Sequence, residues 1–284
     1  MSAALRFLES GDVRWDPVVM GMGHDVYHLR GYATTCEAQQ ADPVVLAVAE
    51  LDGHAVAAPF IVRPVPESLP GAAGLRDAVA PYGYPALICT SENLRVQAKL
   101  LRSLVESMRS QGLVSAFVRC NPFVGLDRSV LREQAEVVRH GELVVVDMGS
   151  LPDAAEESFR LNHRRDIRQL REAGFRVRID HPADRASFPG LYRDRMRAVN
   201  ANPYYLFPDS YFDALFKALG EHARLVAVLD ASNELAAAVI LFVSGTLAHY
   251  HLGASPEEFL KAAPMKLAVL GMICLLYTSP SPRD

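Results

Sequence analysis

Two stretches of the chain repeat the same order of hydrophobic and polar positions. Each begins with an apolar run, passes through a Leu-Asp pair, and continues with a second apolar run that starts with small residues. The stretches are LAVAELDGHAVAAPFIV (residues 46–62) and LVAVLDASNELAAAVILFV (residues 225–243). Asp-Gly in the first and Asp-Ala-Ser-Asn in the second are typical of turns that connect paired strands. The pattern therefore predicts two β-hairpins.

Each predicted hairpin is followed by an aromatic-rich strand and then by a helix. After the first come DAVAPYGYPALIC and ENLRVQAKLLRSLVESMRSQG, in which leucines recur at helical spacing and Gly112 stands where a C-terminal cap is expected. After the second come TLAHYHLGAS and the apolar APMKLAVLGMI. The sequence thus predicts an α/β protein built from two copies of one unit, each a mixed, mostly antiparallel sheet flanked by helices.

The turn residues GSLP (149–152) mark a junction between the two predicted domains. Before it, the patterns of residues 113–123 and 136–148 predict two closing strands of the first domain. After it, we expect a basic helix, a short strand at FRVRI and two more helices before the second hairpin. The predicted domains are 1–150 and 151–273, with the second one truncated.

The last eleven residues, CLLYTSPSPRD (274–284), form a separate segment. They are the one-frame translation of a transposase-adapter sequence used in sequencing libraries. The apolar helix before them contains no stop signal. We therefore interpret 274–284 as a non-native tail, leave it out of the fold prediction, and expect the natural second domain to continue beyond Ile273.

The composition narrows the range of functions. Half of the 284 residues are hydrophobic, enough for one large or two smaller domains with cores of their own. With a net charge of −4, any contact with nucleic acid has to be local, and we expect no stable DNA binding. We find no signal-peptide pattern and no apolar run of membrane-spanning length, and so expect a cytoplasmic protein. The four cysteines lack a Cys-x-x-Cys pair and predict reduced thiols.

His249 and His251 stand one residue apart in the predicted strand LAHYHLGAS. In a strand their side chains point to the same face, with Tyr250 on the other. Metal binding would require a third ligand, for which only Glu257 and Glu258 lie nearby, so we expect no metal site. An imidazole titrates near neutral pH and suits a general base for an incoming amine. Hydrogen-bonded histidines that line a groove without chemistry are the alternative.

A basic stripe follows the domain junction. Arg160, Arg164 and Arg168 recur at helical spacing, with Arg171 further along the same face. Guanidinium groups bind phosphates through paired hydrogen bonds, so this stripe suits a diphosphate-bearing acceptor or the acceptor end of a tRNA. The alternative is the solvated face of an amphipathic helix.

Three further side chains are candidates for substrate binding. Tyr82 and Tyr84, on the loop PYGYP, can stack on a ligand, although tyrosines at hairpin edges are common. Lys266, at the start of the last predicted helix, can meet a phosphate near a helix N-terminus or lie on the surface without a role.

These segments together resemble the Fem-type aminoacyltransferases and their relatives in the GNAT acyltransferase superfamily. The resemblance covers residues 16–273 and rests on the succession HDVYHLRGYA, PYGYP, FVRCNPF, RLNHRRDIRQLREAGFRV, YYLFPDSYFDALFKAL and AHYHLGASPEEFLKAAPMKL, not on any single motif. It implies tandem GNAT-like domains that transfer an acyl or aminoacyl group onto an amine. It also makes His24, Tyr27 and His28 further candidates.

One departure from the GNAT pattern concerns the donor. The GNAT pyrophosphate loop (Arg/Gln-x-x-Gly-x-Gly/Ala) holds CoA phosphates at a helix N-terminus, whereas the nearest string here, REAGFR (171–176), leads into a strand. No nucleophile elbow is present either, which fits direct transfer. We expect no bound cofactor, and aminoacyl-tRNA or acyl-CoA as co-substrate.

The resemblance implies an amine acceptor on a cell-envelope, peptidoglycan-type precursor, which can be lipid-linked at the inner membrane face. Two alternatives stay open. One is an acyl-CoA-dependent N-acetyltransferase acting on a small-molecule or sugar amine. The other is a non-catalytic binding protein with the same fold.

Overall fold

The computed structural model describes residues 4–40, 42–152 and 155–278. By their contacts the residues divide into two compact units. Unit 1 comprises Met1–Gly141 with Asp213–Leu219, and unit 2 comprises Glu142–Phe212 with Gly220–Asp284. The domain boundaries drawn from the sequence stay predictions, and residues 279–284 of the predicted tail lie outside the described residues.

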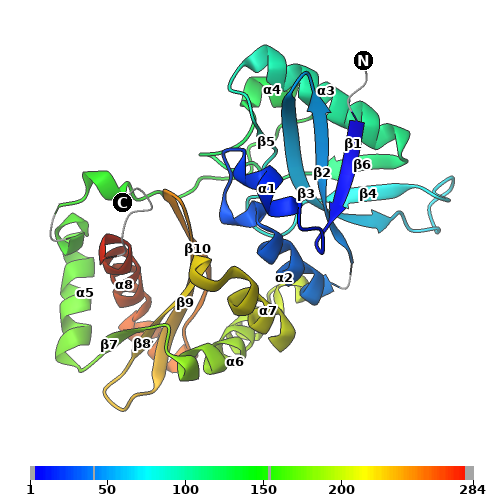
Figure 1. Ribbon diagram of the computed structural model, residues 1–284. Helices are drawn as coiled ribbons and strands as arrows, with labels where there is room; N and C mark the ends of the chain where they lie inside the picture. Colours follow the sequence, from blue (N-terminus) through cyan, green and yellow to red (C-terminus); the bar gives the residue numbers. More distant parts are fainter. Residues whose placement is uncertain (1–3, 41, 153–154, 279–284) are drawn as a thin grey trace. The chain divides into compact units, whose positions relative to one another are not determined.

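Unit 1 is built around one sheet (Figure 1). Its elements in chain order are β1 (Ala4–Glu9), α1 (Trp15–Met20), η1 (Val26–His28), α2 (Arg30–Gln40), β2 (Val44–Leu51), β3 (His54–Pro64), β4 (Arg76–Val79), β5 (Ile88–Cys89), α3 (Leu94–Ser110), β6 (Leu113–Phe117) and α4 (Arg128–Arg132). The strand order is β1-β2-β3-β4-β6, with β5 paired to β3. All pairs are antiparallel except β4 with β6, which is the predicted mixed, mostly antiparallel arrangement.

The first predicted hairpin is confirmed as β2 and β3. Its two turn residues, Asp52 and Gly53, have positive φ angles of 52° and 79°. A two-residue turn with both φ angles positive matches the right-handed twist of the paired strands. The Asp-Gly pair therefore fixes the register of the hairpin.

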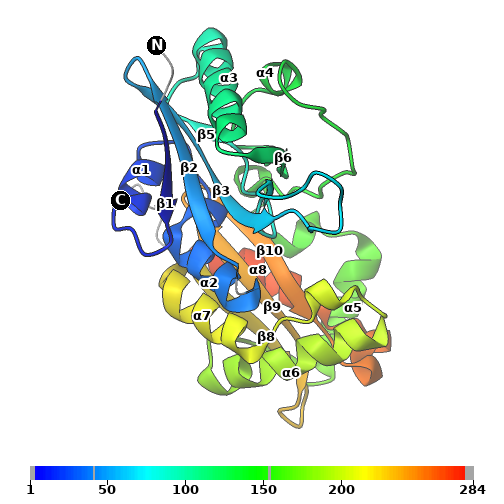
Figure 2. The same cartoon turned by 90° about the vertical axis from the view of Figure 1, so that its right-hand side faces the viewer.

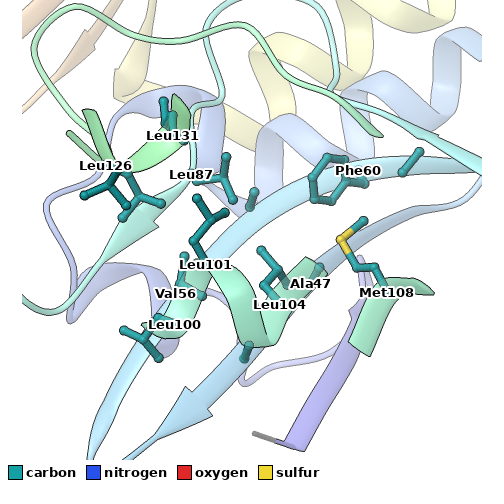
Figure 3. Packing of buried hydrophobic residues seen from close by; sticks show 14 of the residues in the cluster. Ala47, Val56, Phe60, Leu87, Leu100, Leu101, Leu104, Met108, Leu126 and Leu131 are labelled. Atoms are coloured by element: carbon teal, nitrogen blue, oxygen red, sulfur yellow. The ribbon is translucent and has the colours of Figure 1, made fainter. Parts of the chain in front are cut away.

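The core of unit 1 lies between the sheet and α3 (Figure 3). Leu100, Leu101 and Leu104 of this helix are buried against small residues of β2 and β3. Ala47 lies opposite Ala58 in the ladder, so the helix can approach the strands closely. The predicted helix is confirmed. It begins after Asn93, whose side chain accepts hydrogen bonds from two backbone N–H groups of the first turn.

Unit 2 contains a four-stranded antiparallel sheet, in the order β10-β9-β8-β7, which Figure 2 shows from β10 to β8. Its elements in chain order are η2 (Met148–Ser150), η3 (Ala155–Ser158), α5 (Leu161–Glu172), β7 (Arg176–Ile179), α6 (Pro182–Ala198), η4 (Pro203–Tyr205), α7 (Asp209–Leu219, whose last seven residues count with unit 1), η5 (Gly220–His222), β8 (Ala223–Leu229), β9 (Leu235–Ser244), β10 (Leu247–Ala254), η6 (Glu257–Ala262) and α8 (Met265–Thr278). The predicted basic helix, short strand, second hairpin and apolar helix are all confirmed.

The core of unit 2 lies on the face of the sheet that α5 and α8 cover. Val226, Val239 and Leu241 of the strands pack there against Ile167 of α5 and Leu270 of α8. Alternate residues of β9 point to the opposite face, against which α6 packs. Both faces are apolar, which explains the nearly continuous hydrophobic runs of β8 and β9.

The prediction of a strand over residues 136–148 is wrong. This segment forms no strand, and Val144 is 98% exposed. A run of β-branched residues forms a strand only where another strand completes its hydrogen bonds, and none of the described strands pairs with it. The other predicted closing strand of the first domain is present as the short β6.

Candidate functional site

β10 carries both histidines and is irregular at His251. Tyr250 and Leu252 pair with consecutive residues of β9, so His251 is an extra residue without a partner in the ladder. Such a β-bulge interrupts the hydrogen bonding and redirects side chains. His249 lies opposite Phe242, and the ring of His251 stacks on the same phenylalanine with a centroid distance of 4.0 Å. The two histidines therefore share one face of the strand, as the sequence predicts.

His251 is enclosed on this face. Its Nε2 lies 2.9 Å from the hydroxyl of Tyr211, which belongs to the first turn of α7 and stacks on Phe207. His251 and Tyr211 are both buried. Burial, with a smaller contribution from His249, lowers the pKa of His251 to about 3. The imidazole is therefore neutral near pH 7 and a weak proton acceptor.

Tyr250 points to the other face of β10, toward the start of α8. Its hydroxyl donates to Sδ of Met265 at 3.5 Å. Its ring lies over Gly253, where a Cβ atom would overlap the tyrosine hydroxyl. Burial raises the pKa of this hydroxyl. Glycine at 253 thus makes room for a tyrosine that the sequence analysis did not select.

Lys266, in the first turn of α8, forms an ion pair with α5. Its Nζ lies 2.5 Å from Oδ2 of Asp166, and Arg165 approaches the other carboxylate oxygen at 3.3 Å. The hydrogen bond from Lys266 is the main reason that the pKa of Asp166 is lowered. A phosphate bound by Lys266 would have to compete with this carboxylate, so its role in binding stays a prediction.

The arginines of α5 border a surface depression of about 450 Å³, which we call the arginine depression. Its lining residues are Glu156, Leu161, Arg164, Arg165, Arg168 and Arg171. Arg171 forms an ion pair with Glu156, with 2.7 Å between Nη1 and Oε2. Arg168 and Glu172 are further apart, with 3.9 Å between Nε and Oε1.

Two of the three predicted phosphate-binding arginines line this depression. The Nε of Arg164 is buried and has no hydrogen-bond partner among the described residues. Arg160, the third, occupies the N-cap position of α5 without a capping side-chain hydrogen bond, is exposed and does not line the depression. The structure thus brings Arg164 and Arg168 together with Arg165, which the sequence analysis did not select.

Tyr82 and Tyr84 lie in unit 1, on the loop between β4 and β5, and both are half-buried. Unit 1 and unit 2 therefore each carry part of the predicted set of site residues. Within the described ranges, no group of three His, Cys, Asp or Glu side chains could hold a metal ion. None of the helices in these ranges combines the length and the hydrophobicity that a membrane-spanning helix needs.

A family model described as an acetyltransferase (GNAT) domain matches residues 157–278. This part of the chain is therefore similar to GNAT-type acetyltransferase domains. The matched region runs from the end of η3 to the end of α8 and includes both histidines, the arginine depression apart from Glu156, and Lys266. The prediction of an acyltransferase domain is thereby confirmed. No curated protein matches the sequence.

The fold of the whole chain is similar to that of three solved structures. FemX superposes with a TM-score of 0.64 at 14% identity, over 98% of this chain and 87% of FemX. The C-terminal domain (DUF2156) of a protein described as a lysylphosphatidylglycerol synthetase from Agrobacterium fabrum gives 0.59 at 14% identity, over 94% and 75% of the two chains. L-PGS from Bacillus licheniformis gives 0.57 at 11% identity, over 93% and 73%. The predicted Fem-like fold is confirmed.

Tyr211 is the site residue that sequence reasoning missed most clearly. The run YYLFPDSYFDALF predicts an aromatic helix, but several aromatic residues in it could have faced β10. Only the packing of Tyr211 on Phe207 and its hydrogen bond to His251 distinguish it.

Proposed function

We propose that the protein is a Fem-like transferase that moves an acyl or aminoacyl group onto an amine of a cell-envelope precursor, of peptidoglycan type. The observation that carries this proposal is that the likeness to FemX extends over 98% of the chain, and so includes unit 1 as well as the GNAT-like region. The protein from Agrobacterium fabrum supports it, because its name denotes a lipid that carries an amino acid. The reaction would take place in the cytoplasm, at the inner membrane face where the acceptor is lipid-linked.

The chemistry required is aminolysis of an ester or thioester. It needs a neutral amine, an aligned carbonyl carbon and donors for the developing oxyanion, without a covalent enzyme intermediate. We assign the general base to His249, which is half-buried beside the bulge of β10. His251 is a weak acceptor because it is buried with a pKa of about 3, and we assign it the support of β10 through its hydrogen bond with Tyr211.

The start of α8 favours aminoacyl-tRNA over acyl-CoA as the donor. Pro264 has no N–H group, and the N–H groups of Lys266 and Leu267 already donate to the carbonyl oxygens of Ala263 and Pro264. This helix N-terminus therefore offers few free donors to a pyrophosphate. The arginine depression offers guanidinium groups for the phosphates of a tRNA acceptor end, or of a diphosphate-bearing acceptor.

The second candidate function is an acyl-CoA-dependent N-acetyltransferase that acts on a small-molecule or sugar amine. The match of residues 157–278 favours it, because GNAT domains use acyl-CoA as co-substrate. This reading requires CoA phosphates to bind elsewhere than at the first turn of α8.

A parallel assay separates the two functions. The purified chain is incubated with labelled aminoacyl-tRNA or labelled acetyl-CoA and with amine acceptors that include a lipid-linked cell-wall precursor. We expect label to move from aminoacyl-tRNA alone. Transfer from acetyl-CoA alone would overturn the proposal in favour of the second candidate, and no transfer from either donor would indicate a binding protein.

The assignment of the base predicts the effect of His249→Asn. Loss of a general base lowers kcat by roughly 10²- to 10⁴-fold, and we expect the KM for the donor to change little. His140→Asn, the same change at an exposed loop histidine, is the matched control. Steady-state kinetics of both variants check the assignment, which fails if His249→Asn retains wild-type kcat.

A further inference from the structure

The loop of residues 81–86, which contains Tyr82 and Tyr84, is held by hydrogen bonds to two of its backbone carbonyl groups. The hydroxyl of Tyr32 in α2 donates to the carbonyl oxygen of Tyr82 at 2.8 Å. The Nε2 of His28 in η1 lies 2.9 Å from the carbonyl oxygen of Ala86. Both side chains come from residues 28–32 of unit 1, so one short segment holds the loop near its beginning and at its end.

The tautomer of His28 follows from its hydrogen bonds. The carbonyl oxygen of Ala86 can only accept, so Nε2 carries the ring proton and donates to it, and the Nδ1 of the neutral ring accepts the backbone N–H of Asp25 at 3.0 Å. The ring is fully buried, and burial lowers the pKa of His28, so the imidazole stays neutral.

The middle of the loop is shaped by Tyr27. Gly83 has a φ of +96°, and a Cβ atom at this position would overlap the ring of Tyr27. The same ring makes an edge-to-face contact with Tyr84 at a centroid distance of 6.1 Å. Glycine is therefore required twice over at residue 83, for its backbone conformation and for the space that the ring occupies.

The segment that holds the loop is itself anchored. The buried carboxylate of Asp25 accepts the N–H of Val26 and the side-chain amide of Asn121, each at 2.7 Å. The amide oxygen of Asn121 in turn accepts the N–H of Phe123 at 2.9 Å. Buried polar groups that are all hydrogen-bonded hold a single geometry, so this network keeps η1, and with it His28, in place.

We propose that His28 and Tyr32 are positioning residues that hold residues 81–86 as a preformed aromatic platform, on which Tyr82 and Tyr84 bind a ring-bearing part of the acceptor substrate. This inference rests on the proposed transferase function. The two side chains act on the backbone of the loop, and Tyr82 and Tyr84 are half-buried residues. A loop that is ordered before binding lowers the entropic cost of binding, and tyrosine rings stack on the flat faces of ring systems.

Hydrogen exchange tests the positioning without any need for turnover. Tyr32→Phe removes only the hydroxyl that meets Tyr82. His28→Gln keeps a donor near the position of Nε2, whereas His28→Asn keeps only an acceptor near Nδ1. We expect the amides of Tyr82, Gly83, Tyr84, Ala86 and Leu87 to exchange at least about tenfold faster in Tyr32→Phe and His28→Asn, and near the wild-type rate in His28→Gln. Tyr205→Phe in unit 2 is the control, and unchanged loop exchange in both test variants overturns the proposal.

Kinetics then test the platform. We expect Tyr32→Phe and His28→Asn to raise the KM for the acceptor about five- to tenfold, with kcat and the KM for the donor unchanged, and His28→Gln to restore the acceptor KM. A merely structural role would reduce the fraction of active enzyme, so a lower kcat at unchanged acceptor KM overturns the platform. A wild-type protein without transfer from either donor would instead reject the proposed function, while the exchange result still decides whether the loop is held as described.

Discussion

At the scale of single residues, His249 and His251 show that two identical side chains on one face of a strand can differ in burial and in hydrogen bonding. Alternation along a strand is a local property, so the sequence could place both on one face. It could not predict that His251 is buried with a lowered pKa. That difference depends on the bulge at His251 and on Tyr211, 40 residues away in the chain.

We expect acid to destabilise the folded protein through His251. Its pKa is about 3 in the folded chain against an ordinary value of 6.5, so between these pH values the unfolded chain binds a proton that the folded chain excludes. The free energy of unfolding therefore falls as the pH drops below about 6.5, by up to about 1.4 kcal/mol per pH unit for this site, and levels off near pH 3. Urea denaturation at pH 7, 6 and 5 measures the slope.

The matched variant for this slope is His251→Gln, which keeps a polar partner for Tyr211 and removes the titrating ring. We expect a shallower dependence on pH than in the wild type, with part of the slope left because burial lowers the pKa of His28 as well. His140→Gln, at an exposed position, is the control. Equal slopes in wild type and His251→Gln would contradict the assignment.

At the scale of elements, prediction succeeded where the determining contacts are close in sequence. The Asp52–Gly53 turn sets its hairpin, and the leucine spacing and Asn93 set α3. It failed for residues 136–148, because the composition of a strand does not reveal whether a partner strand exists. The sequence also gave no sign of the bulge in β10, since no residue type there requires one.

Helix α8 leads to a prediction about Leu275, which lies within the predicted non-native tail. The helix continues to Thr278, and Leu275 is buried in the core of unit 2. We expect Leu275→Ala to lower the free energy of unfolding by about 2–3 kcal/mol, because it leaves a cavity. Cys274→Ala, at the exposed neighbouring position, is the control. Chemical denaturation compares the two, and an equal, small effect would show that this end of α8 does not contribute to the core.

At the scale of the whole molecule, the succession of motifs predicted the Fem-like fold although no single motif is specific. Each unit has its own apolar core and its own sheet, so weak signals from both halves add up. The distribution of charge was only partly predictable. The net charge is −4, yet Arg164, Arg165 and Arg168 line one depression.

This distribution predicts that the salt dependence of donor binding originates in α5. In a molecule of net negative charge, contacts to phosphate groups have to come from a local cluster of positive side chains. For a single-stranded nucleic acid, each such contact adds about 0.7 to the steepness with which the logarithm of the binding constant falls with the logarithm of the salt concentration. We expect the double variant Arg164→Gln/Arg168→Gln to raise the KM for aminoacyl-tRNA and to reduce that slope by about 1 to 1.5. Arg102→Gln, exposed on α3, is the control. An unchanged slope in the double variant would remove the arginine depression from the donor site.

Residues 143–146 affect how the protein behaves at high concentration. Leu143, Val144, Val145 and Val146 are all about half exposed or more, and they belong to no strand of the described sheets. Four adjacent aliphatic residues with high strand propensity form the kind of segment from which cross-β aggregates grow. The negative charges of the flanking Glu142 and Asp147 therefore oppose aggregation through this segment. We expect the protein to aggregate faster when acid or high salt weakens the repulsion between these charges.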